Sequence, residues 1–285
     1  MPRRLARAVV GVLAVITTLA GLPQPGGAAT LHYVSLGDSY TAASGVTPLA
    51  HGVDPFCLQS TRNYPKLTAA ALGLALTDVS CGGATVGNMT ASQYSDQPPQ
   101  FDALGPDVSV VTLGIGGNDN ALFLSAVAEC GTLGILDPLQ LGAPCTGVYG
   151  SYFANLIDKD AAKIATALRQ IHQLAPGATV FVIGYGEILP HTTGCYPRIP
   201  VVRGDVPYLD GIERHLNSML AQQAAANDAT YVDVYANSAG HDACKPVGVR
   251  WIEPPLSGQP IHPNAIGEAA TARLVTAALH SHGVA

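Results

Sequence analysis

Two residues far apart in the chain have the types and local settings of a nucleophile and a base. Ser39 follows a short apolar run and a breaking residue, Gly37, so its hydroxyl is expected where a strand ends. His262 directly precedes Pro263, a natural first-turn proline, and is expected at the amino end of the last helix. The positive end of a helix disfavours imidazolium and keeps the ring a proton acceptor near neutral pH. Ser39 and His262 are therefore the candidate catalytic pair.

A serine attacking a carbonyl also needs hydrogen-bond donors prepared for the negative oxygen that develops. Glycines follow the second predicted strand, and Asn118 follows the third. The backbone N–H groups of Ser39 and Gly83 and the side-chain amide of Asn118 are the candidate oxyanion hole, with Gly82 as the alternative if the turn begins one residue earlier. Each residue alone is more often an ordinary turn or cap residue. Their recurrence at several strand ends favours a common site.

The elements that must position these residues alternate between strand and helix. Such alternation is typical of a parallel sheet covered by helices on both faces. The Gly/Pro-rich stretch 130–150 is expected to be an irregular insertion. Strands are predicted near 33–37 and at 74–79, 108–113, 178–183 and 230–234, and helices at 63–72, 121–129, 152–174, 208–226 and 264–282.

Two other glycine or serine motifs were weighed against this interpretation. The run Gly114-Ile-Gly-Gly-Asn-Asp119 resembles a dinucleotide-binding loop, but Asp119 stands where the third glycine should be. The stretch Ala236-Asn-Ser-Ala-Gly240 resembles the nucleophile elbow of α/β-hydrolases, but it lacks the first glycine and comes late in the chain. Neither motif supports a competing site.

Residues 1–29 have the pattern of a secretory signal peptide. Arg3, Arg4 and Arg7 precede an apolar run, 8–22, and small residues end the segment with Ala28-Ala29. A membrane anchor is the alternative, but the run is short for a bilayer span. We therefore expect a secreted protein with one domain at 30–285.

The charge of the mature chain and its cysteines restrict the function further. Without the three leader arginines, 11 of the 14 basic residues remain against 20 acidic ones, a net charge of −9, which does not favour a nucleic-acid partner. Six cysteines in an exported chain predict three disulfides, with fifteen pairings open. No C-x-x-C or C-x-x-H pair supplies closely spaced metal ligands, so a metal site is not favoured. The cysteines are Cys57, Cys81, Cys130, Cys145, Cys195 and Cys244.

In these motifs and in their order, the sequence resembles the GDSL-type SGNH hydrolases, close to secreted bacterial lipases and esterases. Gly37-Asp-Ser-Tyr40 resembles the block with the nucleophile, and Gly83 falls at the glycine of the second block. Gly116-Gly-Asn-Asp119 resembles the third block, and His262-Pro-Asn264 the block with the base. The resemblance implies a flavodoxin-like three-layer α/β/α sandwich with a central five-stranded parallel sheet. It also implies the disulfides Cys57–Cys81, Cys130–Cys145 and Cys195–Cys244.

One position departs from the family pattern. The usual triad acid lies three residues before the histidine, where this chain has Gln259. A neutral amide cannot stabilise imidazolium as a carboxylate does. Because some family members resemble this chain in using a backbone carbonyl, we hypothesise a Ser39–His262 dyad whose imidazole is oriented by the Gln259 carbonyl. Asp233 and Asp242 are alternative acids.

The sequence thus predicts a secreted serine ester hydrolase, a lipase or carboxylesterase, acting through an acyl-enzyme intermediate. A phospholipase, a carbohydrate deacetylase or a non-catalytic binding protein on the same fold are the alternatives. The expected partner is a small-molecule or lipid ester substrate, with transient contact to a lipid interface and a monomeric chain. No metal or organic cofactor is expected.

Overall fold

The computed structural model describes residues 30–284. The signal peptide predicted at 1–29, with its cleavage after Ala29, lies outside the described residues.

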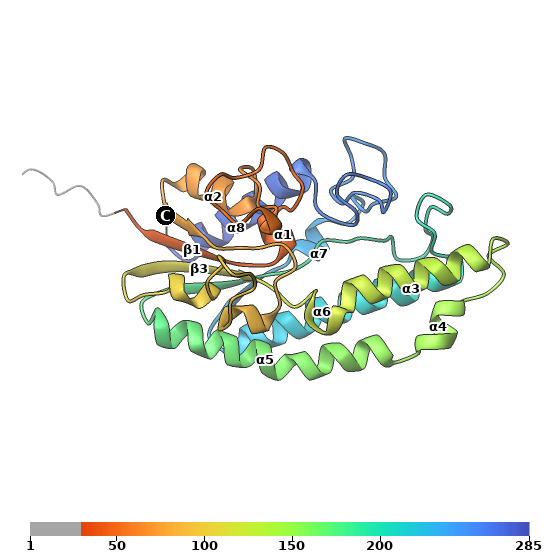
Figure 1. The fold of residues 1–285 in the computed structure, drawn as a ribbon, viewed down its shortest axis with the longest axis horizontal. Helices are drawn as coiled ribbons and strands as arrows, with labels where there is room; N and C mark the ends of the chain where they lie inside the picture. The colour runs from red at the N-terminus through yellow and green to blue at the C-terminus, as the bar shows by residue number, and fades with distance from the viewer. Residues whose placement is uncertain (1–29, 285) are drawn as a thin grey trace, which may run out of the picture.

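A single five-stranded sheet forms the centre of the molecule (Figure 1). Its strands lie in the order β2-β1-β3-β4-β5, and every neighbouring pair is parallel. The carboxyl ends of all five strands therefore meet at one edge, where ligands bind in open α/β sheets. The strands are β1 (His32–Gly37), β2 (Ala75–Asp78), β3 (Val108–Gly114), β4 (Thr179–Ile183) and β5 (Thr230–Val232).

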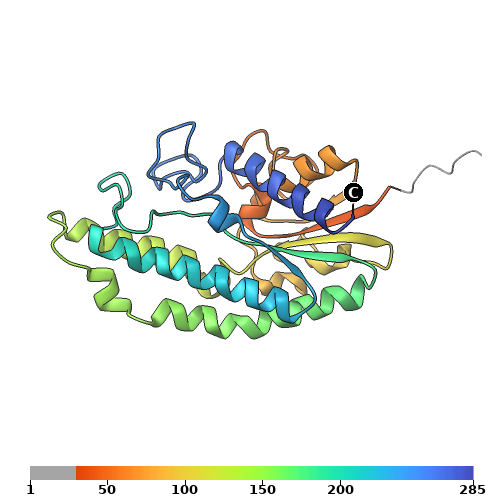
Figure 2. The same cartoon turned by 180° about the vertical axis from the view of Figure 1, so that it is seen from behind.

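Helices cover both faces of the sheet, as Figures 1 and 2 show from opposite sides. One layer holds α2 (Tyr64–Leu72) and α8 (Ala265–Ser281), and the other holds α3 (Leu122–Leu136), α5 (Tyr152–Leu174) and α6 (Val206–Ala226). This arrangement confirms the predicted flavodoxin-like three-layer α/β/α sandwich. Short helices complete the chain: α1 (Ser39–Ala42), α4 (Pro144–Tyr149) and α7 (Val234–Asn237).

Alternating side chains of the central strands fill two separate cores. On β3, Val111 and Leu113 pack among the residues of α5 and α6, whereas Val110 packs with Val275 and Leu279 of α8. All five side chains are buried. A strand buried on both faces is typical of a parallel sheet between two helical layers. This burial holds the carboxyl edge of the sheet rigid.

The segment 130–150 differs from its prediction as an irregular insertion. Helix α3 continues from the predicted end at 129 to Leu136, and α4 occupies Pro144–Tyr149. The glycines that suggested a loop serve close packing instead, because a Cβ on Gly134 would collide with the Pro200 carbonyl. The stretch Asp119–Leu136 has a mean hydropathy of 1.2, enough by length and composition for a membrane span, yet α3 packs against α4 and α5.

Three disulfides lie outside the sheet, and the one between Cys130 and Cys145 joins helix α3 to helix α4. The pairs are Cys57–Cys81, Cys130–Cys145 and Cys195–Cys244, which is the pairing that the family resemblance implies. The first bridge ties the loop after β1 to the turn after β2. It therefore lies beside the candidate site.

Candidate functional site

The turn between β1 and α1 presents Ser39. Gly37 is required there, because a Cβ would collide with the side chain of Thr41 and the carbonyl of Gly114. Asp38 caps the short helix by accepting a hydrogen bond from the Tyr40 N–H at 2.9 Å. Ser39 is the first residue of α1, and its own N–H has no partner among the described residues. The turn therefore presents both the hydroxyl and a free backbone donor.

Ser39 and His262 lie in direct contact although they are 223 positions apart in the sequence. The Ser39 hydroxyl is 2.8 Å from His262 Nε2, and Nδ1 of the same ring is 2.7 Å from the carbonyl oxygen of Pro260. Because a carbonyl oxygen only accepts, Nδ1 must carry the ring proton. Nε2 is then free to accept a proton from the serine hydroxyl.

The carbonyl that orients the imidazole is that of Pro260, so the expectation for Gln259 was wrong by one residue. The Gln259 carbonyl instead accepts from the backbone N–H of His262 at 3.2 Å. Ile261 takes a left-handed conformation with φ of 59°, and this bend brings the Pro260 carbonyl to the ring. The Gln259 side chain donates to the Gly45 carbonyl at 2.8 Å. It braces the loop after β1.

Burial of the imidazole, more than its place near the amino end of the last helix, favours the neutral form of His262. Helix α8 begins at Ala265 with Asn264 as its cap, so Pro263 precedes the helix and is not its first-turn residue. Burial of the imidazole is the main cause that lowers the pKa of His262, and the hydrogen bond to Pro260 opposes it. The predicted neutral state holds for a different physical reason.

Neither alternative acid contacts His262. Asp233 caps α7 by accepting from the Ala236 N–H at 2.9 Å. Asp242 accepts from the Cys244 N–H at 2.8 Å and lies 3.2 Å from the Lys245 ammonium. Both carboxylates are thus engaged elsewhere in the loops.

Gly83 and Asn118 lie on the other side of Ser39. Gly83 has a φ of 78°, and its N–H has no hydrogen-bond partner in the part of the chain that the structure describes. The Gly82 N–H already donates to the Cys57 carbonyl at 2.9 Å, so Gly83 is the better donor of the two. The Asn118 amide donates to the Ala84 carbonyl at 3.0 Å, which leaves its second N–H available.

One cleft of about 550 Å³ brings the predicted residues together. Ser39, Gly83, Asn118 and His262 all line it, and Pro260 lies at its wall. The remaining wall is mainly apolar. It is formed by Phe56, Leu58, Phe123, Val127, Pro255 and Ile261, with Tyr40, Ser44 and Gly82 as further lining residues.

Sequence reasoning missed two tyrosines that hold this site. The Tyr40 hydroxyl donates to the Ile261 carbonyl at 2.6 Å, and its ring lies 5.2 Å from that of His262. The Tyr185 hydroxyl donates to Asp38 Oδ2 at 2.5 Å and accepts from the Gly117 N–H at 2.9 Å. The position of Tyr185 directly after β4, at the carboxyl edge, is the signal that could have indicated it.

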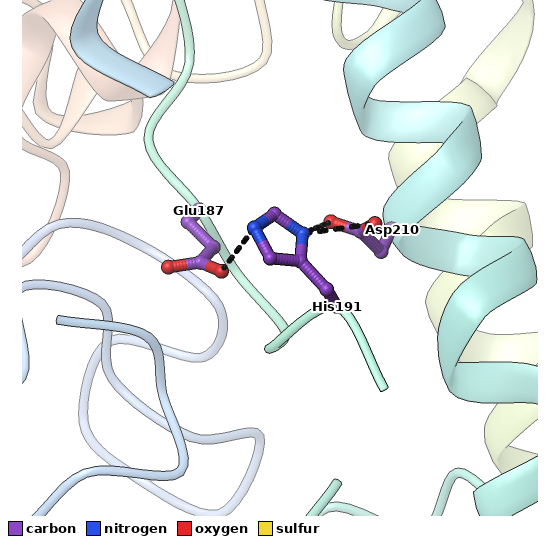
Figure 3. Close-up of side chains that lie close together, drawn as sticks. All are labelled: Glu187, His191 and Asp210. Atoms are coloured by element: carbon purple, nitrogen blue, oxygen red, sulfur yellow. Dashed lines mark hydrogen bonds and ion pairs between the residues drawn. The ribbon is translucent and has the colours of Figure 1, made fainter. Parts of the chain in front are cut away.

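Figure 3 shows a second cluster, Glu187, His191 and Asp210, none of which lines the cleft. Among the described residues it is the only such group whose ligand atoms lie within 4.8 Å of one another. The imidazole lies between the two carboxylates, with Nδ1 3.2 Å from Asp210 and Nε2 3.8 Å from Glu187. Asp210 also accepts from Arg214 and Tyr235. The hydrogen bond between His191 and Asp210 makes the cluster a link between the loop after β4 and helix α6.

A parallel α/β sandwich with a hydrogen-bonded serine and histidine at its carboxyl edge has the architecture of a serine-type hydrolase. The chain belongs to the GDSL-like lipase/acylhydrolase family, whose model matches residues 35–270. It is accordingly a lipase or esterase of that family.

Relatives from Streptomyces agree with this assignment. The chain is 45% identical to Lipase 2 of Streptomyces coelicolor, over 92% of this chain and 90% of that protein. It is 30% identical to an esterase of Streptomyces scabiei, over 85% of this chain and 81% of that protein. Among solved structures, phospholipase A1 from Streptomyces albidoflavus NA297 superposes with a TM-score of 0.72 at 27% identity, covering 88% of this chain and 99% of that one.

Proposed function

We propose that the protein is a secreted serine ester hydrolase that uses Ser39 as nucleophile and His262 as base, without a carboxylate as third member. The observation that carries this proposal is the contact of His262 with the Ser39 hydroxyl on one side and the Pro260 carbonyl on the other. A carbonyl fixes the ring tautomer and orientation, as the triad aspartate does elsewhere.

The reaction follows from this geometry. Ser39 Oγ attacks the ester carbonyl while Nε2 of His262 takes the hydroxyl proton, and the resulting oxyanion accepts from Ser39 N–H, Gly83 N–H and the Asn118 amide. The bond to the alcohol then breaks as His262 returns the proton to the leaving oxygen. Water, activated by the same imidazole, hydrolyses the acyl-enzyme and regenerates Ser39.

The apolar wall of the cleft supports an acyl chain as the group held beside Ser39. Phe56 and Leu58 are exposed at the cleft, and Leu256, adjacent to the lining residue Pro255, is 94% exposed. Apolar groups exposed at the entrance fit transient contact with a lipid interface. We further propose a monomeric chain, exported by the leader at 1–29. A structurally similar protein, from Streptomyces rimosus, is an extracellular lipase (TM-score 0.69, 25% identity, covering 87% of this chain and all of that one).

Hydrolysis of p-nitrophenyl esters from acetate to palmitate by the disulfide-intact protein tests the proposal. We expect turnover that rises with chain length beyond acetate, because the apolar wall gains contact with each added methylene. Turnover confined to acetate would contradict an acyl-binding role and would favour a carbohydrate deacetylase. Absence of both turnover and fluorophosphonate labelling of Ser39 would favour a non-catalytic binding protein.

Phospholipids are the second substrate to measure, because the similar structure from Streptomyces albidoflavus is a phospholipase A1. Release of fatty acid from phosphatidylcholine at a rate comparable to that from a triglyceride would assign the protein to phospholipases. A rate far below it would assign the protein to lipases.

The acid limb of the pH profile of kcat/KM is expected to have its midpoint below pH 6.5. Burial lowers the pKa of His262 from its ordinary value of 6.5. Because only the neutral ring can accept the serine proton, activity is lost as the pH falls through this lowered pKa. A limb centred near pH 7 that moves in Asp38→Asn would contradict this, because burial raises the pKa of Asp38 to about 7.

A further inference from the structure

Tyr185 lies beneath the cleft and connects two strand ends with one hydroxyl. The residue follows β4 by two positions and is buried. Its hydroxyl donates to Asp38 Oδ2 at 2.5 Å and accepts from the Gly117 N–H at 2.9 Å. A tyrosine hydroxyl has one proton to donate and can accept as well, so both capacities are used here.

Each partner of this hydroxyl directly precedes a proposed oxyanion donor. Asp38 precedes Ser39 at the end of β1, and Gly117 precedes Asn118 after β3. Since β1 and β3 are neighbours in the sheet, the two turns lie side by side. The Tyr185 hydroxyl is the bridge between them.

Contacts with α6 and with two aromatic rings hold Tyr185 in place. Its backbone N–H donates to Asn217 Oδ1 at 2.9 Å, and its carbonyl accepts from the Asn217 amide at 3.2 Å. Its ring packs edge-on against the rings of Tyr40 and Phe123, each with a centroid distance of 5.0 Å. Because α6 and these rings fix Tyr185, the two turns take their positions from it.

We propose that Tyr185 is a positioning residue that sets the spacing between the Ser39 N–H and the Asn118 amide, and so aligns the oxyanion hole. This inference rests on the proposed function. Donors act only at the position that the oxyanion will occupy, and a displacement of about 1 Å costs up to roughly 100-fold in rate.

The burial of Asp38 makes the Tyr185 hydroxyl hard to replace. Asp38 is buried, and its carboxylate is faced by the Tyr185 hydroxyl and the Tyr40 N–H, with Asp119 as a further negative charge nearby. Burial raises the pKa of Asp38 to about 7, and the Tyr185 hydrogen bond opposes the rise. Without the hydroxyl, both the carboxylate and the Gly117 N–H lose a buried partner. The two turns would then rearrange to satisfy these groups.

The substitution Tyr185→Phe tests the proposal, because it removes the hydroxyl and keeps the ring that packs against Tyr40 and Phe123. We expect kcat on a p-nitrophenyl ester to fall about 10- to 100-fold while KM stays within about twofold, because the lost alignment matters only in the transition state. Fluorophosphonate labelling of Ser39 is expected to slow by a similar factor. The phosphonylation intermediate uses the same donors.

Tyr33→Phe is the matched control. The buried Tyr33 hydroxyl lies 2.8 Å from Thr112 Oγ1, so this variant loses a buried tyrosine hydroxyl that contacts neither Asp38, Gly117 nor Asn217. We expect its kcat to stay within about twofold of the wild type. Equal losses of kcat in both variants, in step with their melting temperatures, would mean a structural role and would overturn the proposal.

A double-mutant cycle with Asp38→Asn gives a second readout. If Tyr185 acts through Asp38, the double variant should be no slower than the slower single variant. If the losses of kcat in the two single variants multiply in the double variant, the proposal is overturned. An unchanged kcat in Tyr185→Phe would also overturn it. Failure of the proposed function can be distinguished from failure of the Tyr185 proposal, because in the former case the wild type would neither label at Ser39 nor hydrolyse esters.

Discussion

Replacing Ser39 by alanine is expected to lower kcat on an ester by about 10⁶-fold, the scale on which a serine hydrolase depends on its nucleophile. The hydroxyl oxygen is the atom that bonds to the acyl group, and it is the group that contacts Nε2 of His262. The rate would be measured with a p-nitrophenyl ester after titration of active sites. Fluorophosphonate labelling should disappear in the same variant.

His262→Ala is expected to cost nearly as much, because Ser39 and His262 act as one unit. For the same reason the double variant should be no slower than either single one. Ser218→Ala and His215→Ala are matched controls that should keep the wild-type rate, since Ser218 is exposed on α6 and His215 of the same helix contacts Asp158 of α5. A variant lacking Ser39 that retains more than a thousandth of the wild-type kcat would point to another nucleophile.

Replacing Asn118 by alanine is expected to lower kcat by about 10²- to 10³-fold, with little change in KM. The Asn118 amide has a free N–H that lines the cleft with Ser39. Its hydrogen bond to the carbonyl oxygen of the substrate strengthens only when that oxygen becomes negative. Steady-state kinetics over a range of ester concentrations separates the two parameters.

Asn155→Ala is the control for this variant, because Asn155 is an exposed residue of α5 whose amide contacts only Ser151. A loss that appears in KM alone would assign Asn118 to substrate binding. A loss below threefold would remove it from the oxyanion hole, and its contact with the Ala84 carbonyl would then be its main role.

The sheet and the Ser39–His262 contact were predictable because they depend on features that the sequence displays directly. Apolar runs such as 108–113 end in glycine or small polar residues, and parallel strands bring such ends to one edge. The ends of the helices were harder to predict. Gly131 and Gly134 suggest a loop, yet α3 passes through both, and at Gly134 the lack of a side chain permits close contact with Pro200.

The parts of the site that escaped prediction depend on backbone geometry and strand order. The left-handed conformation of Ile261 decides whether the carbonyl of Gln259 or that of Pro260 orients His262. A β-branched residue rarely adopts this conformation, so the sequence does not predict it. The role of Tyr185 depends on β4 lying next to β3. No local motif carries that information.

The separation of Ser39 and His262 by 223 positions in the sequence also bears on when the enzyme can act. His262 reaches the serine only after the last helix has docked, where Glu268 of α8 accepts from the Tyr64 N–H of α2 at 2.7 Å. A chain still under synthesis, or not yet folded, has a nucleophile without a base. Ester hydrolysis through this pair therefore requires that the whole domain has folded.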